Sequence, residues 1–188
     1  MGYEKNQSGQ IVESDQTLTT IQNYFNKNNI NPDIYQQVLM RKVIKTESSV
    51  YLFGESGTGK TTALQMAIKA LENEGKKVLF MSNDSESGTT LDSIFNLSDE
   101  KITFDHPISL TVDQQETLDE TDVLVVDNIN KVPFDRFYAC YLYASHYTTA
   151  LKPQPRWIVS GVFDRNAHYF KMFLNVELKR DYRGHHGR

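Results

Sequence analysis

Short apolar runs alternate along the chain with longer segments of helical spacing. Four apolar runs have the length of buried strands, at residues 49–53, 76–84, 123–126 and 156–161. Four segments have the spacing of helices, at residues 17–27, 32–45, 63–71 and 133–151. Because helices and apolar strands alternate, we expect an α/β fold of three layers, with a central, mainly parallel sheet covered on both faces.

Two further stretches complete the predicted elements. The second helix is expected to begin at Pro32, with Asn31 as its cap, since proline fits the first turn of a helix. Residues 85–121 have no clear period, and they predict only a short helix near 90–95 and a strand near 101–104.

Length and composition predict a single globular domain. The chain has 188 residues, 39% of them apolar, which is enough to bury a core. No stretch approaches the roughly 20 uncharged apolar residues of a membrane helix, and the single cysteine, Cys140, fits the core of a cytoplasmic protein. We expect a flexible N-terminal segment, a core and a basic C-terminal tail, at residues 1–16, 17–175 and 176–188.

Residues 54–61, GESGTGKT, fit the phosphate-binding pattern G-x-x-x-x-G-K-[ST] at every fixed position. The glycines lie where a strand turns into a helix, so backbone N–H groups can form an anion nest at the helix N-terminus. Lys60 is expected to reach the β- and γ-phosphates, and Thr61 to bind Mg²⁺ through its hydroxyl. The predicted nucleotide-binding residues are Gly54, Glu55, Ser56, Gly57, Thr58, Gly59, Lys60, Thr61 and Thr62.

A second signal of a nucleotide site follows the third apolar run. Residues 123–126 lead directly to Asp127, which is the Walker B pattern. A carboxylate at the C-terminal end of a central parallel strand points into the crevice where such sheets bind ligands, so Asp127 is the second predicted ligand of Mg²⁺. An Asp at a strand end is also a common cap, and the prediction gains weight from the strand between Asp127 and the loop.

Other P-loop classes need parts that this chain lacks or alters. GTPases read guanine through N-K-x-D, but the nearest match, NKVP at 130–133, has Pro133 in place of the base-binding Asp. Transporter-type ATPases need L-S-G-G-Q after the loop, and the nearest match, SGQ at 8–10, precedes it. Small nucleotide kinases use an arginine-rich lid, whereas residues 85–150 contain a single arginine, Arg136, so a kinase is a weaker alternative.

The motifs resemble the AAA+ family, in its DnaA-like and DnaC-like branch of replication initiators and helicase loaders. The resemblance spans about residues 31–170 and includes VLVVDNIN at 123–130 and RWIVSG at 156–161. It implies a protein that binds ATP and Mg²⁺ and acts as a loader, initiator-like regulator or adaptor on a partner in DNA replication or processing. It also implies that Ser160 contacts the γ-phosphate or the attacking water.

One departure from the family bears directly on catalysis. Asn128 stands where that branch has an acid beside the Walker B Asp, and an amide cannot accept the proton of the attacking water, so we expect slow ATP hydrolysis. A nucleotide-gated interaction module without significant turnover is the alternative. If hydrolysis is fast, the nearest other acids in the sequence are Asp122 and Glu120. The predicted catalytic residues are Lys60, Asp127, Asn128 and Ser160.

A second departure concerns the lid. Only 28 residues follow Ser160, too few for a full helical lid with its arginine, so the lid is expected to be reduced or absent. The resemblance leaves Arg165, Arg180 and Arg183 as candidates to act on a neighbouring subunit's nucleotide, which would require a homo-oligomer.

The net charge of the chain is −4, and the charged residues are distributed unevenly along it. Residues 151–188 carry eight Lys or Arg against three Asp or Glu, whereas residues 1–150 carry 12 against 21. The basic end predicts contact with DNA or with a partner's nucleotide, and a solvated surface is the alternative. The aromatic residues of 133–151 could stack on bases, but their helical spacing favours core packing.

Overall fold

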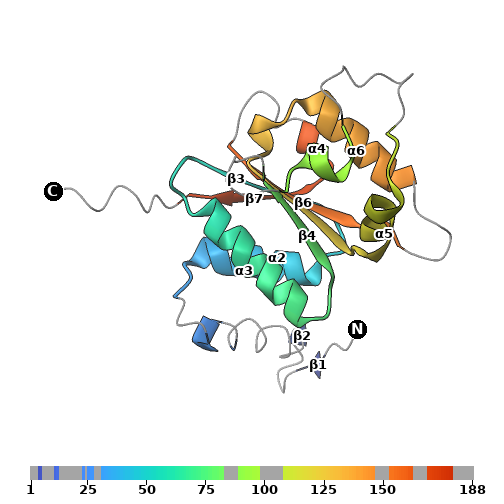
Figure 1. The fold of residues 1–188 in the computed structure, drawn as a ribbon. Coiled ribbons are helices and arrows are strands. Elements are labelled where there is room, and N and C mark those ends of the chain that lie inside the picture. Colours follow the sequence, from blue (N-terminus) through green and yellow to red (C-terminus); the bar gives the residue numbers. More distant parts are fainter. Residues whose placement is uncertain are drawn as a thin grey trace.

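The computed structural model describes residues 4–5, 11–12, 23, 25–27, 31–82, 89–97, 108–146, 153–162 and 169–179. Within these ranges five strands form one sheet in the order β4-β5-β6-β3-β7, and every neighbouring pair is parallel. The strands are β3 Val50–Gly54, β4 Val78–Ser82, β5 Val123–Asp127, β6 Arg156–Gly161 and β7 Leu174–Leu178. The predicted α/β fold with a central parallel sheet is confirmed, and Figure 1 shows the sheet between two groups of helices.

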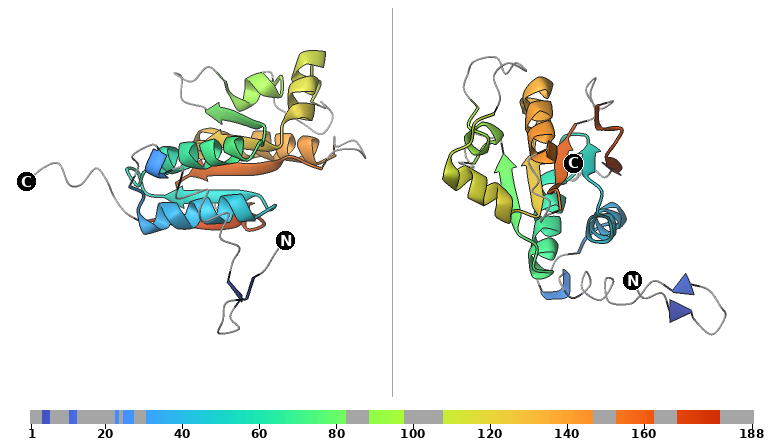
Figure 2. Two further views of the ribbon diagram at one scale, coloured as in Figure 1. Left: turned by 90° about the horizontal axis from the view of Figure 1, so that it is seen from below. Right: turned by 90° about the vertical axis from the view of Figure 1, so that its right-hand side faces the viewer.

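The helices cover both faces of the sheet. One face carries α2 Ile34–Lys45 and α3 Lys60–Asn73 (Figure 1 and Figure 2). The other carries α4 Leu91–Ile94, α5 Val112–Glu120 and α6 Phe134–His146. A short 3-10 turn, η1 Ile129–Lys131, joins β5 to α6.

Strand side chains alternate between two apolar cores. In β3, Val50 and Leu52 belong to the core under α2 and α3, whereas Tyr51 belongs to the core under α4, α5 and α6. Because both faces are covered, the central strands are apolar almost throughout. Cys140 is fully buried in the second core, as its sequence context predicts, and burial raises the pKa of its thiol well above the usual range.

The order of the strands places the predicted motifs at one edge of the sheet. β6 lies between β3 and β5, and the C-terminal ends of these parallel strands meet at the same edge. Val126 pairs with Val159 in register, so the next residues, Asp127 and Ser160, are neighbours. Ser82 at the end of β4 pairs with Asp127. A row of polar side chains therefore crosses the C-terminal edge of three adjacent strands.

The start of α2 differs from the prediction. The helix begins at Ile34, and its cap is Asp33 rather than Asn31. The Asp33 carboxylate accepts the N–H of Gln36 at 2.8 Å, and the Gln36 side chain accepts the N–H of Asp33 at 3.1 Å. This reciprocal capping box satisfies two backbone donors at once, so the prediction of Asn31 as the cap is wrong.

Two elements of the layered core, the helix α5 and the strand β7, are missing from the sequence prediction. In α5 only Leu118 is buried, so the helix lacks an apolar stripe. In β7, Val176 and Leu178 are buried while Asn175 and Glu177 are exposed. An edge strand covered on one face alternates in this way and forms no continuous apolar run. β7 crosses the expected boundary between residues 175 and 176, so the core extends to Leu178.

The remaining expectations fall largely outside the described residues. The predicted strand at 101–104 lies there entirely, whereas in the predicted helix at 17–27 residues 23 and 25–27 are helical and Phe25 is buried. In the N-terminal segment, β1 Glu4–Lys5 pairs with β2 Ile11–Val12 in antiparallel register. None of the helices in the described ranges is long and apolar enough to cross a membrane.

Candidate functional site

The loop between β3 and α3 has the backbone shape of an anion nest. Gly57 and Gly59 have φ angles of 88° and 74°, in the left-handed region that residues with a Cβ rarely adopt. A Cβ on Gly54 would overlap the carbonyl oxygen of Leu178 in β7 and lie 2.8 Å from the Thr58 hydroxyl oxygen. The structure therefore explains why both fixed positions of the motif require glycine: Gly54 has no room for a Cβ, and Gly59 has a positive φ.

The N-terminus of α3 carries no side-chain cap. Its N-cap is Gly59, and its first turn contains no acidic residue. By contrast, α2, α4 and α5 each begin with a capping box. Glycine has no side chain that could cap α3, so the first N–H groups of the helix and its dipole favour a bound anion at this end.

Lys60 and Thr58 make hydrogen bonds to the loop backbone. Lys60 Nζ donates to the carbonyl oxygens of Gly54 at 2.9 Å and Glu55 at 2.8 Å. The Thr58 hydroxyl is buried and donates to the Glu55 carbonyl at 2.9 Å. The Thr58 side chain thus holds the loop rather than facing outward. The exposed members of the predicted nucleotide-binding set are Glu55, Ser56, Thr61 and Thr62.

Asp127 is the centre of the hydrogen-bond network at this edge. Its Oδ2 accepts the hydroxyl of Thr61 at 2.8 Å. Its Oδ1 accepts the hydroxyl of Ser160 and, at 3.0 Å, the backbone N–H of Asn128. Only 3% of Asp127 is exposed. The structure therefore joins the first turn of α3, the end of β5 and the end of β6 in one site.

The oxygen atoms around Asp127 suit a magnesium ion. A carboxylate beside a threonine hydroxyl offers the hard oxygen ligands that Mg²⁺ prefers. The three hydrogen-bond donors to Asp127 are neutral, so a cation would offset the cost of burying this charge. Among the described residues no cluster of His, Cys, Asp or Glu could hold a metal alone. Phosphate and water oxygens would complete the coordination, as is usual for Mg²⁺.

Asn128 lies beside Asp127 in a left-handed backbone conformation, with φ 56° and ψ 49°. Asparagine tolerates this conformation better than most residues that carry a Cβ. Its backbone N–H also lies 3.3 Å from the hydroxyl of Ser160, which is fully buried. The structure therefore places both residues at the predicted edge, and their parts in hydrolysis remain predictions.

Two polar residues at this edge are missing from the sequence prediction. Ser82 is 4% exposed and pairs with Asp127, and the Asn130 side chain is bonded to the backbone of Val162. Each stands at or just after the end of an apolar run, which is the signal that identified Asp127. The candidate arginines Arg165, Arg180 and Arg183 lie outside the described residues.

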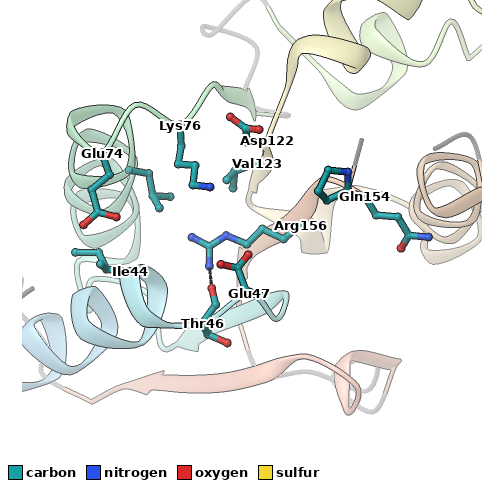
Figure 3. A pocket seen from close by; sticks show the side chains of 11 residues that line it. Ile44, Thr46, Glu47, Glu74, Lys76, Asp122, Val123, Gln154 and Arg156 are labelled. Carbon is teal, nitrogen blue, oxygen red and sulfur yellow. Dashed lines mark hydrogen bonds between the residues drawn. The ribbon is translucent and has the colours of Figure 1, made fainter. Parts of the chain in front are cut away.

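A cavity of about 110 Å³ lies at the opposite edge of the sheet (Figure 3). Arg156 at the start of β6 reaches into it and donates to the carbonyl oxygen of Thr46, the C-cap of α2. Burial lowers the pKa of this guanidinium. Glu47 and Glu74 also line the cavity, so its charges have both signs. The cavity is therefore separate from the nucleotide edge, and Arg156 ties the end of α2 to the sheet.

Comparisons with known proteins agree with this geometry. Residues 41–151, more than half of the chain, match the model of a family described as AAA domain. No curated protein matches the chain. Among solved structures, the Pif1 helicase from Candida albicans is 21% identical with a TM-score of 0.64, covering 82% of this chain and 41% of that one. Pif1 from Bacteroides in complex with ADP-AlF3 and ssDNA is 21% identical with a TM-score of 0.63, covering 82% and 43%.

The two kinds of comparison carry different information. The chain spans less than half the length of these helicases, and at such identities the likeness shows the fold alone. Neither structure is a replication initiator or a helicase loader. The assignment of this chain to the branch of initiators and loaders therefore remains a prediction. The family model, however, covers both the loop at 54–61 and Asp127. Because these are the parts that form the site in the structure, we conclude that the chain belongs to the AAA domain family of P-loop ATPases.

Proposed function

We propose that the chain binds ATP with Mg²⁺ at the loop of residues 54–61 and acts as an ATP-dependent component of DNA-processing machinery. The observation that carries the nucleotide part is the 2.8 Å hydrogen bond between Thr61 and Asp127. It joins two residues that are 66 positions apart and that the two sequence motifs select independently. The loop and the first turn of α3 would hold the phosphates, and Thr61 and Asp127 would hold the ion.

Within this proposal the chain is a loader, initiator-like regulator or adaptor that hydrolyses ATP slowly. A bound Mg²⁺ would neutralise charge on the phosphates during transfer. Ser160 and the Asn128 backbone would orient the Asp127 carboxylate, since both donate to its Oδ1. A nucleotide kinase is less well supported, because Arg136 is held in an ion pair with Asp92 at 2.7 Å.

Replacing Asp127 with asparagine is expected to remove the effect of Mg²⁺ on ATP binding. In the native protein Mg²⁺ should tighten binding about tenfold or more, the size of one charge-assisted interaction. In Asp127→Asn the gain should fall below about twofold, whereas ATP without Mg²⁺ should bind at least as well because a negative charge is gone. Isothermal titration with and without Mg²⁺ measures both quantities.

The control is Asp119→Asn, which removes an exposed carboxylate of α5 and should keep the full gain from Mg²⁺. An Asp127→Asn protein that still gains tenfold from Mg²⁺ would place the ion elsewhere. Native protein that fails to bind ATP under either condition would refute the proposed nucleotide site itself.

The DNA part of the proposal is supported by the basic end of the sequence and by the likeness of the fold to Bacteroides Pif1, which was solved in complex with ssDNA. A truncation that tests it must keep β7, because Val176 and Leu178 are core residues. Removing residues 180–188 takes away Arg180, Arg183 and Arg188. If each contacts a phosphate, the slope of log affinity against log salt should become shallower by about 2 to 3 units.

Fluorescence anisotropy with single-stranded DNA at several salt concentrations tests this prediction. The matched control is the full chain with Lys69→Ala, which removes an exposed positive charge of α3 and should leave the slope unchanged. An unchanged slope in the truncated protein would show that the basic end is only a solvated surface.

A further inference from the structure

The Asn130 side chain binds both backbone groups of one residue on the neighbouring strand. Its Oδ1 accepts the N–H of Val162 at 2.6 Å, and its Nδ2 donates to the carbonyl oxygen of Val162 at 3.2 Å. A paired β-strand would satisfy Val162 in a similar way. The side chain thereby extends the pairing of β5 with β6 past the last residue of both strands, which are Asp127 and Gly161.

Two neighbouring residues, Gly161 and Tyr51, support this contact. A Cβ on Gly161 would overlap Asn130 Oδ1 and lie 2.8 Å from Ile129 Cγ2, so only glycine allows the amide to approach. The hydroxyl of Tyr51 in β3 also donates to the Val162 carbonyl at 3.0 Å. The point where the chain leaves β6 is therefore held both by β3 and by the turn after β5.

The contact lies two residues beyond the nucleotide edge on both chain segments. Asn130 follows Asn128 by two residues, and Val162 follows Ser160 by two residues. Asn128 and Ser160 both donate to Asp127, and the Asn128 N–H lies 3.3 Å from the Ser160 hydroxyl. Any change in the distance between the ends of β5 and β6 would therefore move these two residues and the Asn130–Val162 contact together.

We propose that Asn130 is a positioning residue that fixes the turn carrying Asn128 against the end of β6, and so sets the preference of the site for ATP over ADP. The inference rests on the proposed nucleotide site. The backbone N–H groups of the loop at 54–61 would contact the phosphates that ATP and ADP share, whereas Lys60 and the ends of β5 and β6 would face the third phosphate. Groups that recognise a ligand must be held to within about 0.5 Å, and two hydrogen bonds to rigid backbone provide that restraint.

The test compares Asn130→Ala with Asn175→Ala. Asn175 is a matched control, because its side chain also donates to backbone carbonyls, those of Phe170 and Phe173. It lies near the start of β7, at the end of that strand away from the nucleotide site. Isothermal titration with Mg²⁺ gives the dissociation constants of ADP and of a non-hydrolysable ATP analogue. In Asn130→Ala the ratio of analogue affinity to ADP affinity should fall about fivefold or more, the usual lower range of coupling between sites.

The affinity for ADP should change by less than about twofold in Asn130→Ala, and Asn175→Ala should keep the native ratio. Asn130→Asp keeps the acceptor for the Val162 N–H and loses the donor, so its ratio should lie between those of the native protein and Asn130→Ala. It decides the question alone if Asn130→Ala does not fold. Thermal unfolding verifies the fold of each variant.

Two results would overturn the inference. One is a ratio in folded Asn130→Ala within about twofold of the native value. The other is an equal loss of affinity for both nucleotides, because that would indicate a general structural role. Failure of the native protein to bind either nucleotide is a separate result, which refutes the proposed function before the role of Asn130 is reached.

Discussion

Replacing Lys60 with alanine is expected to lower the affinity for ATP at least tenfold. The substitution removes the positive charge that would lie against the β- and γ-phosphates. Charge-assisted hydrogen bonds contribute about 1.5–3 kcal/mol each, and about 1.4 kcal/mol corresponds to a factor of ten. Isothermal titration with ATP and Mg²⁺ measures the change.

The structure also identifies what this experiment must control. Lys60 Nζ bonds the carbonyl oxygens of Gly54 and Glu55, so alanine also removes two contacts inside the loop. Thermal unfolding of Lys60→Ala should therefore accompany the titration. Lys69→Ala removes an exposed lysine of the same helix, paired with Glu72 at 3.3 Å, and should bind ATP normally. Unchanged affinity in a folded Lys60→Ala protein would exclude the loop as the phosphate site.

Giving Asn128 a carboxylate is expected to raise steady-state ATP hydrolysis by at least tenfold. General-base assistance is typically worth about 10² to 10⁴ in rate, and an amide cannot supply it. The native protein should therefore turn over well below about 1 s⁻¹, the lower end of the usual range for enzymes, while binding ATP well. A phosphate-release assay with and without single-stranded DNA compares the native protein with the variants.

The backbone at Asn128 determines which variants are informative. Its left-handed conformation, with φ 56°, costs most residues roughly 1–2 kcal/mol, and Asn and Asp tolerate it best. Asn128→Asp places a carboxylate on the native backbone, whereas Asn128→Glu has the longer reach but strains the turn. The two variants together separate the missing carboxylate from the conformation of the turn.

Lys60→Ala combined with Asn128→Asp should be inactive if hydrolysis occurs at this site. Rapid turnover by the native protein would contradict the prediction and require another base. The acidic residues nearest in the sequence, Asp122 and Glu120, are not placed to act as that base. Asp122 binds the Lys77 N–H at 2.8 Å and Glu120 pairs with the Lys77 side chain at 2.9 Å, both before the start of β5. Absence of hydrolysis in every variant would instead favour a nucleotide-gated interaction module.

The sequence by itself determined the class of fold and the identity of the phosphate loop. Both depend on local features: the apolar runs of β3 and β5, and glycines at 54 and 59 before a lysine and a threonine. Local patterns fail where an element is only half covered. β7 is the outermost strand of the sheet, beside β3, and its residues alternate between buried and exposed, so its apolar side chains never form a run.

Only the tertiary structure decided which residues share the site. The order of the strands places β6 between β3 and β5, and the register sets Ser160 beside Asp127. The same arrangement brings Asn130 against Val162, 32 residues away. The sequence specifies the side chains but not which parallel strands lie next to each other. Pairing between distant strands depends on how all five pack against the two layers of helices, and no local segment contains that information.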